Sequence, residues 1–185
     1  MMKILTSLTL ITFIACGQTA VKQESENNTT KTIDGWKTLS ESNYSIQYPS
    51  TWELNQNRQM GTSLILFSPL ENNEDQFREN VNLIIQDLKG QNIDLDKYSE
   101  ISEGQVKTMI TNSILINSER VKNGKNEYHR LIYSGDQGIF HLKFEQYYWV
   151  ENDKAYLLTF TCEQNKFSDY KEIGETILNT FSLKK

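Results

Sequence analysis

The sequence predicts an α+β domain in which helices pack on a central antiparallel sheet of about seven strands. The first observation is a run of apolar and aromatic residues from Ile139 to Cys162, which is typical of two long strands joined by a tight turn. The second is a series of further strand-like segments separated by short turns, which favours antiparallel pairing. The third is a pair of segments with helical spacing, Asp94–Thr111 and Lys166–Phe181, that could cover such a sheet.

The hairpin formed by Ile139–Cys162 is expected to turn at Asn152 and Asp153, because Asn and Asp tolerate the positive φ of tight hairpin turns. A two-residue loop would set Tyr148 opposite Leu157. A loop one residue longer would set Tyr148 opposite Leu158 and would gather more apolar side chains on one face, and we therefore favour it. Either register leaves apolar residues on both faces, so we expect partial cover on both sides.

The remaining strands are expected where apolar or alternating segments lie between turn residues. They are Trp36–Leu39, Tyr44–Tyr48, Trp52–Leu54, Ser63–Ser68, Val81–Leu88, Ile114–Val121 and Glu127–Tyr133. The last two flank Asn123-Gly124, a strong hairpin signal. The segment Leu70–Asn80 is acidic but lacks the ligand spacing and the turn glycine of a calcium loop, and we expect a solvated loop there.

Both predicted helices have an apolar stripe. Asp94 is a plausible N-cap of the first helix, and Ser168 or Asn165 could cap the second. The first stripe comprises Leu95, Tyr98, Ile101, Gln105, Met109 and Ile110, and the second comprises Phe167, Tyr170, Ile173, Ile177, Leu178 and Phe181. We expect the second helix to be structural cover for the sheet.

Residues 1–15 are interpreted as a signal peptide. Lys3 precedes an apolar run, Ile4–Ala15, that is too short to span a bilayer. The run ends at Cys16 and Gly17 and resembles a bacterial lipobox, in which the cysteine thiol takes a diacylglycerol. Phe13 stands where that motif usually has Leu. An ordinary cleaved signal with an incidental cysteine is the alternative to lipidation of Cys16.

Residues 16–35 are expected to be the lipidated cysteine and a flexible tether, followed by one domain at 36–185. The segment Gly17–Lys31 is polar and has no aromatic residue, so it cannot bury enough apolar surface to become ordered. We expect the lipid to hold the domain at a bacterial membrane in the cell envelope, with the outer membrane favoured. If Cys16 is acylated, Cys162 has no disulfide partner and is best interpreted as a small core residue.

Several segments resemble PsbP-like domains, a family likeness that extends to the DcrB-like bacterial lipoproteins. They are the opening Tyr44–Trp52 with its aromatic-Pro-x-x-Trp pattern, Val81–Leu88, the Asn123-Gly124 hairpin leading to Tyr133, Ala155–Phe160 and the closing Ile177–Phe181. The resemblance covers roughly Trp36–Leu183 and rests mostly on packing residues, so it indicates the fold far more than the function.

The resemblance implies a central antiparallel sheet with helices on both sides, a PsbP-like α/β/α sandwich. Plant members of the family assist the oxygen-evolving side of photosystem II. That role is not carried over, because the N-terminal region here is a tether with an expected lipid anchor. For this chain, the resemblance implies an adaptor or assembly role toward protein partners as an option.

The sequence shows no catalytic, cofactor-binding or metal-binding pattern. His129 and His141 are the only histidines, and both fall in predicted strands without further ligands at metal-site spacing. His141 is expected to face solvent. Carboxylate pairs occur at Asp94 and Asp96 and at Glu100 and Glu103, but such pairs are common on exposed helix faces. A formal net charge of -5 without a basic cluster argues against nucleic acid as a partner.

Two functions therefore remain open. The first is a non-enzymatic envelope lipoprotein whose domain binds a protein partner, in assembly or maintenance of a membrane complex. The second is a carrier or sensor that holds a small apolar ligand between sheet and helix. Tyr147, Tyr148 and Trp149 suit either function, and they also suit plain core packing. A large exposed apolar patch would favour the first function and an enclosed cavity the second.

Overall fold

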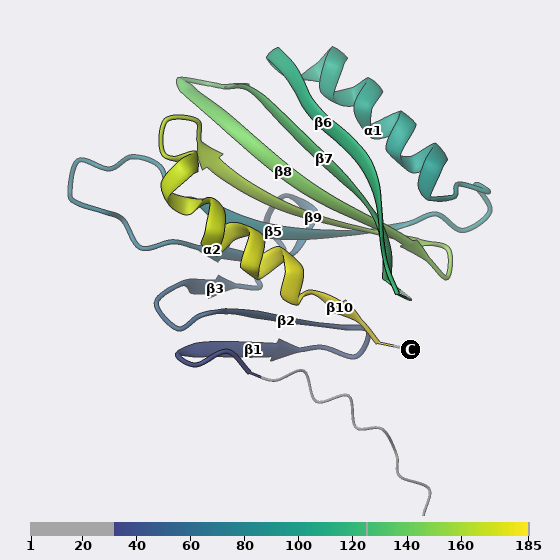
Figure 1. The fold of residues 1–185 in the computed structure, drawn as a ribbon, viewed down its shortest axis with the longest axis horizontal. Helices are drawn as coiled ribbons and strands as arrows, with labels where there is room; N and C mark the ends of the chain where they lie inside the picture. Colours follow the sequence, from purple (N-terminus) through teal and green to yellow (C-terminus); the bar gives the residue numbers. More distant parts are fainter. Residues whose placement is uncertain (1–31, 125, 185) are drawn as a thin grey trace, which may run out of the picture. The chain divides into compact units, whose positions relative to one another are not determined.

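The computed structural model of the protein describes residues 32–124 and 126–184. They form a seven-stranded antiparallel sheet, a three-stranded sheet and two α-helices, which confirms the predicted α+β class (Figure 1). The large sheet has the order β3-β4-β5-β9-β8-β7-β6, with bounds Glu53–Asn55, Thr62–Phe67, Asn80–Asp87, Lys154–Glu163, Phe140–Glu151, Asn126–Gln137 and Thr111–Asn123. The small sheet has the order β1-β2-β10, with bounds Trp36–Ser40, Tyr44–Pro49 and Ser182–Leu183.

The hairpin of β8 and β9 has the shorter of the two loops considered, so the favoured register was wrong. Tyr148 pairs with Leu157, and the turn consists of Asn152 and Asp153 alone. Both turn residues have positive φ, 53° and 57°, as the two-residue turn that matches strand twist requires. The expected gain from gathering apolar side chains on one face does not arise, because each face of this hairpin has its own hydrophobic core.

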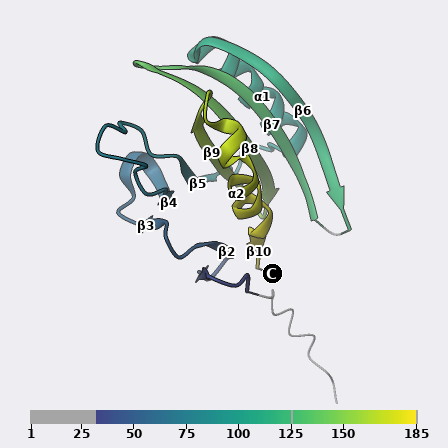
Figure 2. The ribbon, with the colours of Figure 1, turned by 60° about the vertical axis from the view of Figure 1, so that its left-hand side comes forward.

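The two faces of the large sheet are covered by different elements, as the residues of the hairpin predicted. Helix α1, Leu95–Met109, packs on one face through Tyr98, whose ring meets Tyr148 edge-on at 5.5 Å. Helix α2, Phe167–Thr180, packs on the other face over Phe160 (Figures 1 and 2).

Contact between α2 and the sheet is close. A methyl group added at Gly174 would lie 2.6 Å from the ring of Phe160. Phe181, directly after the helix, is buried and packs against Tyr44 and Trp149. The helix is therefore structural cover, as predicted. The expected side-chain cap was wrong, because Lys166 is the N-cap and makes no side-chain cap bond.

Helix α1 begins where the sequence indicated. Asp94 is the N-cap, and its Oδ1 accepts a hydrogen bond from the Lys97 backbone N–H at 2.8 Å. The predicted apolar stripe was only partly right, because Ile101 and Met109 are exposed. The buried face consists of Leu95, Tyr98, Ser99 and Val106. The hydroxyl of Ser99 donates to the Leu95 carbonyl at 2.7 Å, which lets a polar residue lie on this face.

The small sheet was not expected as a separate layer. Its strand β2 is joined to the end of α2 by the hydroxyl of Thr180, which accepts from the Gln47 backbone N–H at 2.9 Å. Two residues after the helix, Ser182 and Leu183 pair with β2 and complete this sheet. Residues 182–183 are too few to give a strand signal in the sequence.

The acidic segment before β5 is not simply solvated, which corrects the expectation for Leu70–Asn80. Lys166 at the start of α2 forms ion pairs with Glu71 at 3.2 Å and with Asp75 at 3.5 Å. Glu79 is completely buried, and its burial raises the pKa of its carboxyl. These contacts fix the loop against α2.

No helix in residues 32–124 or 126–184 is long and apolar enough to cross a membrane.

Candidate functional site

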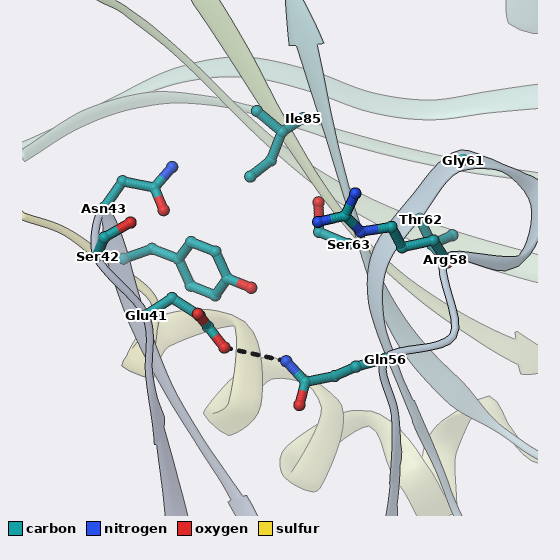
Figure 3. A pocket seen from close by; sticks show the side chains of 10 residues that line it. Glu41, Ser42, Asn43, Gln56, Arg58, Gly61, Thr62, Ser63 and Ile85 are labelled. Atoms are coloured by element: carbon teal, nitrogen blue, oxygen red, sulfur yellow. Dashed lines mark hydrogen bonds between the residues drawn. The ribbon is translucent and has the colours of Figure 1, made fainter.

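A pocket of about 480 Å³ opens between the β1–β2 turn and the β3–β4 loop (Figure 3). Most of its lining residues are polar. The lining residues are Glu41, Ser42, Asn43, Tyr44, Gln56, Arg58, Gly61, Thr62, Ser63 and Ile85. The pocket lies at the β3–β4–β5 end of the large sheet, where the small sheet approaches it.

The loop that carries Arg58 has an uncommon backbone. Arg58 and Met60 have φ of 54° and 50°, a left-handed conformation that non-glycine residues adopt rarely, and Gly61 follows with φ of 79°. Strand β4 then starts with an irregular register between Thr62 and Leu64. Together the left-handed turn and this β-bulge redirect the chain and bring Arg58 to the rim of the pocket.

Arg58 is the cationic side chain of the pocket. Its guanidinium forms no ion pair and no side-chain hydrogen bond with any residue that the structure describes. Figure 3 shows it directed into the pocket beside Ser63. Glu41 lies on the opposite wall, where its Oε1 accepts a hydrogen bond from Gln56 Nε2 at 3.0 Å. The charged lining is thus one guanidinium and one carboxylate, which do not meet.

Tyr44 supplies a hydroxyl donor on an otherwise buried side chain. The residue is 3% exposed and its ring stacks on Phe181. Burial, with a smaller contribution from the charge of Glu41, raises the pKa of Tyr44 to about 12, so the hydroxyl stays protonated at neutral pH. That hydroxyl makes no hydrogen bond with another described residue and lines the pocket, where it can donate to a ligand.

This arrangement suits binding better than catalysis. Ser42 and Ser63 line the pocket, but no histidine or second carboxylate accompanies them as a base. The residues instead offer hydrogen-bond donors around a guanidinium, with one carboxylate across the pocket. They can hold a small polar molecule in a fixed orientation.

The residues considered from the sequence lie elsewhere. Cys16 falls outside the described residues, so its lipidation stays a prediction. Cys162 is completely buried, and burial beside Glu79 raises the pKa of its thiol well above the ordinary value. A neutral, inaccessible thiol is a core residue, as the strand context predicted.

The two histidines are not brought together. His141 is exposed, as predicted, and its Nδ1 lies 2.5 Å from Asp136 Oδ1. His129 contacts the hydroxyl of Ser118, 2.8 Å from its Nε2, and that hydroxyl also donates to Glu103. Because the hydroxyl proton goes to the carboxylate, the serine can only accept from the imidazole, and His129 does not activate it as a nucleophile.

The other carboxylates of α1 have structural partners. Asp94 caps the helix, Asp96 pairs with Arg120, and Glu100 pairs with Lys97 at 2.8 Å. Across the described part of the chain, no group of three or more His, Cys, Asp or Glu side chains could hold a metal ion.

The aromatic run in β8 serves mainly as core. Tyr147, Tyr148 and Trp149 are all buried, on alternating faces of the sheet. The pocket residues were missed because their signals are weak in the sequence. Tyr44 was interpreted as a strand residue and as the start of the PsbP-like opening, not as a site residue, and Arg58 lies in a polar stretch. The single hint was Gly61, which marks a turn before a strongly apolar strand.

Comparisons with known proteins relate the fold to known structures. No family model and no curated protein sequence matches the chain. Cyanobacterial PsbP from Synechocystis is similar in structure, with a TM-score of 0.59 and 16% identity over 82% of this chain and 94% of that chain. The fold is PsbP-like.

Two further solved structures share this PsbP-like fold. LpqN, which is involved in cell envelope biogenesis of Mycobacterium tuberculosis, has a TM-score of 0.62 and 10% identity over 81% of this chain and 91% of its own. A Pseudomonas aeruginosa protein of unknown function has a TM-score of 0.56 and 10% identity over 81% of this chain and 98% of its own. At these identities the likeness concerns the fold alone.

Proposed function

We propose that the chain is a non-enzymatic envelope lipoprotein whose PsbP-like domain binds a protein partner and supports assembly or maintenance of a membrane complex. The anchor in this proposal is a lipid on Cys16, which would hold the domain at a bacterial membrane, with the outer membrane favoured. The structural similarity to LpqN, a protein of cell envelope biogenesis, supports an envelope role.

The observation that carries the partner-binding role is the free edge of β6. This strand has 13 residues and pairs only with β7 among the described strands, so one side of it offers main-chain N–H and C=O groups (Figure 2). Ile114 and Ile116 on this strand are 64% and 50% exposed. Met109 before the strand and Ile139 in the adjacent β7–β8 turn are exposed as well.

An edge of this kind suits recognition by strand addition, in which main-chain hydrogen bonds give affinity and side chains give specificity. Two register shifts, between Thr111 and Ile114 and between Leu115 and Asn117, interrupt the first half of β6. Bulges blunt an edge against indiscriminate pairing. From Asn117 onward the ladder is regular, so a partner strand would pair there, and its continuation would run past Ile116 and Ile114.

The alternative of an apolar ligand between sheet and helix receives no support from the packing. The ring of Phe160 fills the space directly under Gly174 of α2. The pocket described above is lined mainly by polar side chains and lies outside this layer.

Site-specific photocrosslinking in the native envelope tests the proposal. A photoreactive residue at position 116 should capture one protein partner, and adding Ile114→Lys to that variant should abolish the capture without lowering the melting temperature. Leu70, 52% exposed in the acidic loop, is the matched control. It is replaced in turn by the photoreactive residue and by Lys. Equal capture from position 70, or capture that survives Ile114→Lys, would exclude β6 as the binding edge.

The anchor is tested separately. Cys16→Ser should release the protein from membranes into the soluble fraction. Membrane fractionation that is unchanged in this variant would exclude lipidation of Cys16.

A further inference from the structure

We propose that the pocket between the β1–β2 turn and the β3–β4 loop binds a small zwitterion of about dipeptide size, with its carboxylate on Arg58 and its ammonium group on Glu41. This site is separate from the β6 edge, and the inference does not rest on partner binding there. It adds a ligand to the function proposed above.

The position of the ligand's carboxylate is inferred from hydrogen-bond donors in the pocket that have no partner among the described residues. The Arg58 guanidinium has no partner among the described residues, and a guanidinium binds a carboxylate through two parallel hydrogen bonds. The Tyr44 hydroxyl is a second donor, because it lines the pocket and makes no hydrogen bond with another described residue. A ligand oxygen could accept a hydrogen bond from this hydroxyl as well as from the guanidinium.

The position of the ligand's ammonium group is inferred from Glu41 on the opposite wall of the pocket. Gln56 occupies one oxygen of Glu41, and Oε2 makes no hydrogen bond with another described residue. A plain dianion such as phosphate would meet the charge of Glu41 across the pocket, which is unfavourable. One positive and one negative side chain on opposite walls instead match a ligand whose own two charges are separated (Figure 3).

Size selects a dipeptide over a single amino acid. A volume of about 480 Å³ falls within the usual range of small-ligand pockets. The charged walls face each other across this space, so the two charges of the ligand need a spacer such as a peptide unit. Asn43, on the Glu41 side, and Ser63, beside Arg58, also line the pocket and could bond that unit.

Isothermal titration calorimetry of the full-length protein in detergent tests the inference with three matched compounds. They are L-alanyl-L-alanine, its N-acetyl derivative without the ammonium charge, and its C-terminal amide without the carboxylate. We expect the dipeptide to bind with Kd of roughly 1 mM or below, and each blocked form to bind at least about tenfold more weakly. Inorganic phosphate is the fourth compound, and we expect it to bind more weakly than the dipeptide.

Variants assign each end of the ligand. Arg58→Gln should lower the affinity for the dipeptide to that of its amide. Glu41→Gln should lower the affinity for the dipeptide to that of the N-acetyl form. Tyr44→Phe should lower the affinity for the dipeptide several-fold. Lys89→Gln, an exposed turn residue outside the pocket lining, should change nothing. Undetectable heat with the dipeptide, an unaffected Arg58→Gln variant, or tighter binding of phosphate would each overturn the inference.

Discussion

Replacing Arg130 by Met should destabilise the domain strongly at neutral pH and only weakly in mild acid. Arg130 of β7 lies beside Glu145 of β8, and its Nε donates to Glu145 Oε1 at 2.7 Å. The same guanidinium also reaches Glu119 of β6 at 3.2 Å and Glu175 of α2 at 3.0 Å. Arg130 thus holds two neighbouring strands and the covering helix together.

The magnitude follows from the burial of the pair. The Glu145 side chain is 0% exposed and that of Arg130 is 23% exposed. Removing one partner of a buried ion pair costs about 3–5 kcal/mol, because the other charge stays buried without compensation. Water reaches part of the guanidinium, so we expect about 3 kcal/mol, the lower end of this range. Met keeps most of the aliphatic packing of Arg130, so little of the loss comes from contact area.

The pH dependence follows from the direction of the pKa shift of Glu145. Burial raises the pKa of this carboxyl, and Arg130 opposes the increase. Without Arg130 the folded-state pKa rises further above the unfolded value of about 4.3. Folding then favours the protonated acid, so the penalty is absent below the unfolded pKa and grows as pH rises toward the folded pKa.

Urea unfolding of soluble residues 32–185, followed by tryptophan fluorescence at pH 7 and at pH 4.5, measures both effects. The double variant Arg130→Met with Glu145→Gln should recover most of the loss at pH 7. Arg120→Met is the matched control, because Arg120 pairs with the exposed Asp96 and Glu127 and should contribute little. A loss below about 1 kcal/mol, or an equal loss at both pH values, would refute this account of the pair.

Three further predictions use the same unfolding assay or thermal melts. Phe181→Ala should cost about 3–5 kcal/mol because it empties a buried aromatic site, and a loss below about 1 kcal/mol would contradict this. Gly174→Ala should cost about 1–3 kcal/mol, because its methyl group would overlap the ring of Phe160, and a neutral result would mean that α2 can move away from the sheet. Deleting residues 17–31 should leave the melting temperature nearly unchanged, whereas a drop of many degrees would show that this segment packs on the domain.

The fold was predictable where one residue pattern had one physical consequence. The alternation in β8 and β9 could only form strands, and Asp94 could only cap a helix that begins after it. The register of the hairpin was not decided by the same pattern. Apolar residues occupy both faces, so the hydrophobic pattern fitted either loop, and the positive φ of Asn152 and Asp153 decided between them.

The pocket could not be predicted because its residues come from segments that have no shared sequence pattern. Glu41 and Tyr44 lie in or beside a turn, Arg58 in a loop, and Ile85 in a strand that follows a long acidic segment. The turn that carries Glu41 and Tyr44 belongs to the small sheet, which β10 completes by pairing with β2 after α2. A strand of two residues at the end of the domain therefore helps to place a site formed near its beginning.

The order of the large sheet separates the two proposed surfaces. The pocket involves β4 and β5 near one edge, whereas β6 is the opposite edge strand, with β9, β8 and β7 between them. These central strands are tightly packed by α1 and α2, and such cores transmit a change only when they have a second stable arrangement. We therefore expect no coupling free energy between the two sites, so that Ile114→Lys with Ile116→Lys leaves the dipeptide Kd unchanged. By reciprocity, dipeptide at saturating concentration should leave crosslinking at position 116 unchanged. A change of about fivefold or more in either measurement would instead mean that the sheet has two states. Ligand binding in the pocket would then change the affinity for the partner at β6.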